Sequence, residues 1–250
     1  MRQRIHWVLL TLILLCYSCS ENFSINSEIC NEQHYISEFV MNPEIYISNK
    51  KFTFKVDHFD SLNEKYLTDT IQLITSNKKW TFDSLQYRIE WVIDNMSSST
   101  GVSVNDSAIW LHPPRSNKLY KKLEFSPFPY VVFSKDSSFT WSFAFDVPSS
   151  YSIKEIAEWQ GIRTFSSHYK ISDTVLLPTP LGDLQCLKIV GECDNTLNTT
   201  ILTSYFNHKY VFVRMEYSTV DNQKIVFDLI EMSDYEDKSN ISLFPELLNE

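Results

Sequence analysis

The sequence predicts a mainly β protein: an antiparallel meander that forms a curved or half-barrel-like sheet, with one or two short helices. Runs of alternating apolar and polar residues recur through most of the chain, which is typical of half-buried strands. Short turn-forming connections separate the last four runs, so sequential strands should pair as neighbours. No segment between those runs is long enough to be a crossover helix, and this favours antiparallel pairing.

The composition supports a folded core and excludes nucleic acid as a partner. Hydrophobic residues make up 43% of the chain and aromatic residues 14%, which is too apolar for wholesale disorder. The net charge is −9 and no basic run occurs, whereas phosphate binding requires clustered Lys and Arg.

The four glycines exclude the common phosphate-binding loops. Gly101, Gly161, Gly182 and Gly191 are too far apart to form a P-loop or a dinucleotide-binding fingerprint. A G-x-S-x-G nucleophile elbow is also absent. We therefore expect no cofactor, no catalytic residue and no enzyme activity.

The N-terminus has the pattern of a secretory signal over residues 1–18. Arg2 and Arg4 precede an apolar run of nine residues, Trp7–Leu15, which is shorter than the ~20 residues of a membrane-spanning helix. Ser18 is the small residue expected before the cleavage site. Cys19 would then be the first mature residue.

A cysteine at that position resembles the signal of bacterial lipoproteins, in which the cysteine is lipidated. Cys16 departs from the pattern, because an aliphatic residue is usual three positions before Cys19. Ser20-Glu21-Asn22 resembles the surface-export tract of Bacteroidetes lipoproteins. We therefore expect a lipid-anchored protein of the cell envelope, at the outer membrane and with surface exposure as an option; ordinary secretion is the alternative. Several acyl chains on one N-terminus anchor a protein stably.

Three further cysteines remain in the mature chain: Cys30, Cys186 and Cys193. An exported protein can form disulfides, but Cys186 and Cys193 fall on one predicted strand, ~23 Å apart at ~3.3 Å per residue, too far for a bond. A turn at Gly191 or a pairing with Cys30 remains open. Buried free thiols are the preferred interpretation.

In chain order, the pattern predicts the following elements. Residues 20–27 form a tether, and a short helix follows over 28–42 and ends at Pro43. Residues 95–101 form a loop, and a helix covers 150–160, with Ser152 and Glu155 at capping-box spacing. Strands are predicted at 50–59, 83–94, 103–112, 121–125, 130–133, 139–145, 162–172, 181–190, 199–206, 210–218 and 224–232.

The domain prediction follows from these elements. Residues 19–48 carry the lipidated cysteine and the tether, and residues 49–233 form one β-rich domain. Pro113-Pro114 marks the best candidate for an internal boundary, near 113–116, and residues 234–250 form a polar tail.

Several stretches from residue 111 onwards together resemble one family, over the second half of the chain well and over the first half loosely. They are LHPPR, SPFPYVVF, TWSFAF, PTPLGDLQCLKIVGE, SYFNHKYVFVRMEY and KIVFDLIEM, in that order. They are similar to the TapB-like lipoproteins of Bacteroidetes and to related families of unknown function. One motif of the family is matched by Pro180, Leu181, Gly182 and Cys186. A second motif is matched by Tyr205, Phe206, Asn207, Tyr210, Phe212 and Val213. Within this second motif, Val211 stands where the family usually has glycine.

The resemblance implies an open, half-barrel-like antiparallel sheet, similar to the carriers that shuttle lipoproteins to the outer membrane. It implies no catalytic residues. Its matched residues would serve turns and packing.

No arrangement of histidines or carboxylates indicates a reaction. His34, His58, His112, His168 and His208 lack the i, i+2 or i+4 spacing of a metal site, although His168 and His208 could meet in space. Four carboxylates could be paired for glycan hydrolysis only if the fold brought two of them together: Glu90, Asp94, Asp146 and Glu216.

Asp followed by Ser or Thr and then an aliphatic residue or Ala occurs five times. This resembles the O-glycosylation acceptor motif of exported Bacteroidetes proteins, and the same pair is common in turns at strand entries. The five candidate acceptors are Ser61, Thr70, Ser84, Ser107 and Thr174.

Two functional hypotheses follow. In the first, the concave apolar face of the sheet binds an acyl chain or another hydrophobic ligand in a cavity of several hundred cubic ångströms. In the second, the protein is a structural or protein-interaction component of the envelope, with an exposed apolar patch for an envelope protein partner. An enzyme that acts on glycans is a third, weaker hypothesis.

Overall fold

The computed structural model describes residues 43–236, except residues 82, 135, 137, 155, 157, 195 and 196. The predicted signal at 1–18, Cys19, Cys30, His34 and the helix over 28–42 lie outside the described residues, as does the tail from residue 237. Among the described residues, no helix has the length and apolar character required to cross a bilayer.

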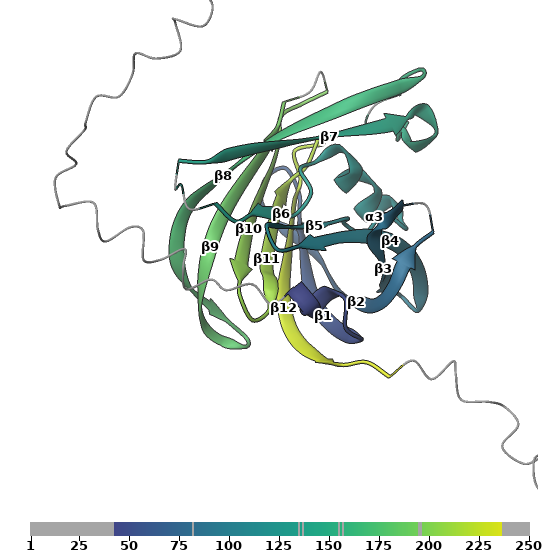
Figure 1. Ribbon diagram of the computed structural model, residues 1–250. Coiled ribbons are helices and arrows are strands. Elements are labelled where there is room, and N and C mark those ends of the chain that lie inside the picture. Colours follow the sequence, from purple (N-terminus) through teal and green to yellow (C-terminus); the bar gives the residue numbers. More distant parts are fainter. Residues whose placement is uncertain are drawn as a thin grey trace, which may run out of the picture. The chain divides into compact units, whose positions relative to one another are not determined.

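Twelve strands form a single sheet (Figure 1). Their bounds are β1 Lys50–Phe59, β2 Lys65–Trp80, β3 Asp83–Ile93, β4 Met96–Asn105, β5 Ala108–Leu111, β6 Tyr130–Val132, β7 Thr140–Pro148, β8 Ile162–Thr179, β9 Gly182–Cys193, β10 Thr200–Asn207, β11 Val211–Ser218 and β12 Lys224–Asp234.

The sheet is an antiparallel meander in which strands that are neighbours in the chain are neighbours in space. The order is β6-β5-β4-β3-β2-β1-β12-β11-β10-β9-β8-β7, so the first and last strands pair in the middle of the sheet. The sheet is nearly closed and barrel-like, and its two edges are the consecutive strands β6 and β7. The predicted fold class is confirmed, and the last four predicted strands correspond to β9–β12.

In the first half, one strand was not predicted and two predictions are wrong. Strand β2 was not predicted, although Ile71 and Leu73 alternate with polar residues and are buried. Residues 95–101 are not a loop, because Asp94 and Asn95 make a two-residue turn with positive φ values of 49° and 65°, and β4 starts at Met96. Residues 103–112 are not one strand but the hairpin of β4 and β5.

Two other segments differ from the prediction. Residues 121–125 are helical: α3 (Lys118–Lys121) is followed by the 3₁₀ helix η2 (Lys122–Phe125), because the Asn117 side chain accepts hydrogen bonds from two backbone N–H groups and caps the turn. The predicted helix over 150–160 is only the 3₁₀ helix η3 (Ser149–Tyr151) in the described residues.

After η3, the described residues up to 160 form no regular helix, and packing holds Trp159 in place. The Trp159 indole N–H donates to the Val147 carbonyl over 3.2 Å. The ring of Trp159 also packs on Phe125 and Phe165, with centroids 5.4 and 6.1 Å away. These contacts place Trp159 in a small second core, and tertiary packing overrides the local capping-box signal.

The concave face of the sheet is apolar and carries the main core. Cross-strand registers place its buried side chains on one face, for example Val56 beside Phe227 and Leu73 beside Trp91. The opposite, convex face is polar and carries ion pairs such as Arg214–Asp228 at 2.5 Å and Lys224–Glu216 at 3.1 Å. This alternation fixes the register, because a shift by one residue would expose the core.

Residues 112–129, between β5 and β6, cover the concave face, and we call them the plug. The plug contains α3 and η2, and Figure 1 shows α3 beside the inner strands of the curved sheet. Tyr120 packs on His58 of β1 and Phe227 of β12, with ring centroids 5.5 and 5.9 Å apart. Phe125 stacks on Phe165 of β8 at 5.4 Å. The plug therefore occupies the space in which a ligand was expected.

A third short element, the 3₁₀ helix η1 (Pro43–Tyr46), precedes β1. Tyr46 is fully buried and packs edge-on against Phe52, with ring centroids 5.3 Å apart. The start of the described chain is thereby attached to the core.

Candidate functional site

The two edges of the sheet face each other through aromatic side chains. Trp110 of β5 packs on Phe143 of β7 with ring centroids 5.3 Å apart, and Tyr130 of β6 lies 6.2 Å from both Trp141 and Phe143. We call these four residues the aromatic seam. No ladder hydrogen bond joins β6 to β7 in the described part of the chain, so side chains alone close the barrel here.

The seam contains buried donors that have no acceptor. The indole N–H groups of Trp110 and Trp141 find no hydrogen-bond partner among the described residues, although their side chains are 9% and 8% exposed. A buried polar group without a partner costs roughly 1–3 kcal/mol. The two unsatisfied indole groups therefore lower the stability of the seam.

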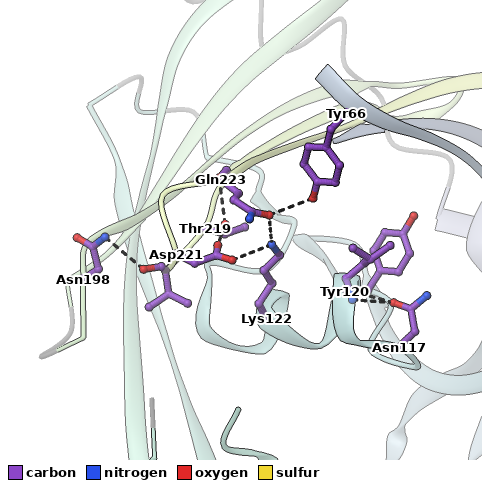
Figure 2. A network of polar contacts seen from close by, with 10 residues as sticks. Tyr66, Asn117, Tyr120, Lys122, Asn198, Thr219, Asp221 and Gln223 are labelled. Carbon is purple, nitrogen blue, oxygen red and sulfur yellow. Dashed lines mark hydrogen bonds and ion pairs between the residues drawn. The ribbon is translucent and has the colours of Figure 1, made fainter. Parts of the chain in front are cut away.

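A buried polar network attaches the plug to the sheet (Figure 2). The Lys122 ammonium group, with a side chain only 4% exposed, donates to Asp221 over 3.0 Å and to Gln223 over 2.6 Å. Gln223 also accepts a hydrogen bond of 3.1 Å from the Tyr66 hydroxyl group. Figure 2 shows that Lys122 reaches from the plug to the turn before β12, where it meets these two acceptors.

The Tyr120 hydroxyl group makes a second attachment. It donates to Asp69 over 3.1 Å and lies 3.3 Å from Nε2 of His58. His58 is itself 3.2 Å from Asp69. Burial lowers the pKa of His58, although the Asp69 carboxylate opposes this effect. His58 is thus a buried partner of the plug.

Glu124, in η2, is the most unusual side chain of the plug. It is 1% exposed, and neither carboxyl oxygen has a hydrogen-bond partner among the described residues. Oε1 lies 3.6 Å from Nε2 of His112 and 3.6 Å from a terminal nitrogen of Arg115, slightly beyond hydrogen-bond distance. Burial raises the pKa of Glu124 to about 7, although Arg115 opposes the shift.

His112 does not provide a compensating charge at neutral pH. Burial lowers the pKa of His112 to about 3. Its Nδ1 lies 2.8 Å from the Pro113 carbonyl oxygen, and its ring packs on Phe128 at 4.8 Å. Glu124 is therefore a buried carboxyl group whose one close cation, Arg115, lies 3.6 Å away, slightly beyond hydrogen-bond distance.

A separate cleft of about 420 Å³ lies on β7, β8 and β9. The cross-strand register places Ser142, His168 and Glu192 side by side, and each is exposed. Within the described residues, no hydrogen bond joins these three side chains to one another. The row is a solvated polar surface, since nucleophilic catalysis requires an oriented base.

The histidines and carboxylates considered as catalytic candidates are not brought together. His168 lies in the same cross-strand row as Ile201, at the start of β10, whereas His208 follows the end of that strand. Glu90 pairs with Arg88 at 2.6 Å, and Glu216 with Lys224. Asp146 accepts from Thr164 at 2.6 Å, and Asp94 lies in the β3–β4 turn.

Metal and disulfide chemistry find no support in the described residues. No group of three His, Cys, Asp or Glu side chains is arranged to hold a metal there. Cys186 and Cys193 lie on the same strand, β9, and both are buried, as predicted. Cys186 is a free thiol, and burial raises its pKa to about 12.

The five candidate glycosylation acceptors lie at the surface. Ser61, Ser84 and Ser107 are exposed at strand starts or turns, Thr70 is exposed on β2, and Thr174 on β8 is half-buried. Their modification stays a prediction.

Sequence reasoning missed the plug, the aromatic seam and Glu124. The only signal for the plug was the Asn117 cap before an apolar segment that is rich in proline. Burial of Glu124 had no signal, because a lone glutamate is usually solvent-exposed.

No protein-family model matches the chain. No curated protein matches it either. Three solved structures are similar at a distance: a lipoprotein from Parabacteroides distasonis (9% identity, TM-score 0.39, 78% of this chain and 98% of that chain), the hypothetical lipoprotein YmcC from Escherichia coli (10%, 0.37, 85% and 100%) and an exported protein with YmcC-like fold from Bacteroides fragilis (9%, 0.38, 76% and 99%).

Proposed function

We propose that this protein is a cell-envelope lipoprotein, anchored at the outer membrane through Cys19, whose curved sheet binds an acyl chain or a similar hydrophobic ligand. The ligand enters through the aromatic seam and displaces the plug from the concave face. The protein has no enzyme activity in this proposal. The signal pattern at residues 1–18 supports the anchor, and the geometry of the seam supports the ligand.

The observation that carries the proposal is the closure of the barrel by side chains between β6 and β7. Separating these strands breaks no ladder hydrogen bond between them, whereas opening the sheet at another strand pair would break a full ladder. The main cost of opening is apolar surface exposed to water. An apolar ligand removes that cost.

The free energy lost when the plug leaves the concave face is comparable to the free energy gained when a long acyl chain is buried there. Displacing the plug exposes Tyr120, Leu123, Phe125 and Phe128, each worth roughly 1.5–3 kcal/mol, or about 6–12 kcal/mol together. An acyl chain of about 16 carbons gains ~0.8 kcal/mol per buried CH₂, or about 12 kcal/mol. A single long chain can therefore replace the apolar contacts of the plug, and a short chain cannot.

Quenching of tryptophan fluorescence by a brominated fatty acid tests this proposal. Bromine quenches only tryptophans near the bound chain, and the seam contributes Trp110 and Trp141. We expect dibromostearate to quench the purified chain saturably, and the quenched fraction to fall in Trp110→Phe and Trp141→Phe. Dibromo derivatives of short-chain acids should have little effect.

Trp80 provides the matched control, because it lies at the end of β2, away from the seam. Trp80→Phe should keep the full quenching of the parent chain. Quenching that is absent, non-saturable or unchanged in both seam variants would contradict the proposal. The anchor is tested separately by mass spectrometry of the mature N-terminus from the native host, which should show acyl groups on Cys19.

A second candidate function is protein interaction through an edge of the sheet. Strand β7 is nine residues long, and its outer edge has no strand partner among the described residues. Such an edge can pair with an extended segment of another envelope protein. If no lipid binds, cross-linking from Ser142 of β7 in intact cells is the experiment that identifies this partner.

A further inference from the structure

Glu124 lies in the plug with its carboxyl group buried and without a hydrogen bond among the described residues. The side chain is 1% exposed, both oxygens lack hydrogen-bond partners among the described residues, and its nearest cation is 3.6 Å away. A neutral carboxyl group tolerates this position far better than a carboxylate, because burial penalises the charged form most.

The plug is constructed so that it can move as a unit. The Leu111 N–H donates to the Pro129 carbonyl over 2.9 Å, so the two ends of the segment are tied together. At its start the plug is bonded to β4 through the backbone, since the His112 N–H donates to the Gly101 carbonyl over 3.1 Å. From residue 113 to 128, the hydrogen bonds to the sheet each use a side chain: Lys122 to Asp221, Tyr120 to Asp69, Thr200 to the Phe125 carbonyl at 3.0 Å, and the Phe128 N–H to the Tyr169 hydroxyl group at 3.1 Å. Release of the plug leaves the strand ladders intact.

The groups around Glu124 compensate its charge only in part. His112 and Arg115 face it from the chain after β5, and Lys121 acts on it from α3. Lys122, the next residue, is engaged by Asp221 and Gln223. In the described residues, Arg115 is the only one of these four groups with a charged nitrogen within 4 Å of the carboxyl group, and its side chain is 29% exposed.

We propose that Glu124 is a proton-controlled switch of the plug: the protonated carboxyl group holds the plug on the concave face, and ionisation releases it for ligand binding. This inference rests on the proposed function for the identity of the ligand. The release itself is a property of the chain alone.

The direction of the pH dependence follows from the two states. In the closed state the pKa of Glu124 is about 7, and in the open state it returns to an ordinary value near 4.5. Opening therefore releases a proton between these values. The open population should rise as the pH increases from about 4.5 to about 7, by on the order of a hundredfold, and stay constant above that range.

Hydrogen exchange of the full chain, corrected for the intrinsic pH dependence of exchange, measures the open population without any ligand. We expect protection of residues 117–128 to fall steeply between pH 4.5 and 7, while protection of β1 and β12 stays constant. Glu124→Gln should remove this dependence and keep the plug protected at pH 8. Glu231→Gln, at an exposed position on β12, is the matched control and should behave as the parent.

A second variant keeps the test independent of how well the first one folds. Arg115→Ala removes the cation that opposes the shift in the closed state, so the fall in protection should still begin near pH 4.5 but continue to a higher pH and reach a greater total loss. Two results would overturn the switch. In one, the protection of the plug from hydrogen exchange does not change with pH in the parent chain; in the other, it changes equally in Glu124→Gln.

Dibromostearate quenching in the same pH series separates the two proposals. A pH-dependent plug without saturable quenching leaves the switch standing and rejects the lipid. Saturable quenching with pH-independent protection of the plug supports the lipid and rejects the switch.

Discussion

At the scale of single residues, two backbone positions are constrained, Gly191 by its contact with the plug and Val211 by its own conformation. A Cβ atom added at Gly191 would lie 2.6 Å from the Tyr169 ring and 2.9 Å from Pro127 of the plug. Val211 adopts a φ of 63°, a region that favours glycine. A valine in this conformation costs roughly 1–2 kcal/mol.

Gly191→Ala should therefore destabilise the protein, because the methyl group forces apart Tyr169 and the plug. We expect a loss of about 1–3 kcal/mol in the free energy of unfolding, measured by urea denaturation. Gly101→Ala is the control: its Cβ would meet the end of the flexible Gln86 side chain, which can move. Equal destabilisation of the two variants would argue against the tight plug contact.

At the scale of elements, the plug shows how tertiary contacts decide local structure. Residues 121–125 alternate enough to predict a strand, yet Asn117 starts a helical turn and Lys122 finds its acceptors only on the distant β11–β12 turn. In contrast, β9 to β12 are long and alternating and are joined by short turns, so local pattern and tertiary packing agree there.

Removing the Lys122 charge should loosen the plug selectively. Lys122→Met leaves Asp221 and Gln223 without their shared donor, and we expect a loss of roughly 1–3 kcal/mol, because Asp221 is partly solvated. Hydrogen exchange should show reduced protection of residues 117–128. Lys50→Met breaks the solvent-accessible ion pair with Asp234, and should cost at most about 0.5 kcal/mol. If residues 117–128 were as well protected from hydrogen exchange in Lys122→Met as in the parent chain, Lys122 would not be what attaches the plug to the sheet.

At the scale of the whole molecule, the ring of strands is stabilised unevenly. β1, β11 and β12 have a strand partner on both sides and bury residues of the main core. β6 and β7 each pair on one side only, in the described chain. The molecule should therefore open first at the seam and not at the junction of its first and last strands.

Amide exchange across the sheet checks this order. We expect β1 and β12 to exchange only through global unfolding, and β6 and β7 to exchange through smaller openings with lower free energies. The two cases differ in how steeply the free energy of opening falls with denaturant concentration. Global unfolding exposes more surface, so its slope is larger. Equal slopes for all strands would mean that the seam does not open independently.

The stability of the whole chain should also depend on Glu124. Its pKa is raised to about 7 in the folded state, so its stabilising proton is fully retained below about pH 4.5 and lost as the pH rises towards 7. Relative to Glu124→Gln, the parent chain should lose on the order of 3 kcal/mol over this range. Denaturation of both chains at pH 4.5 and 8 measures the difference, and a difference that is the same at both pH values would contradict it.

The sequence alone determined the fold class and the antiparallel meander, because strand periodicity and short turns are local patterns. The secretory signal at residues 1–18 is likewise a local pattern, and it stays a prediction. The five candidate O-glycosylation acceptors and the lipidation of Cys19 also follow from local motifs, and they stay predictions. Only the tertiary structure decided that residues 112–129 fill the concave face, that Trp110 and Phe143 close the barrel, and that Glu124 is buried. These depend on contacts between residues far apart in the chain, which no local pattern encodes.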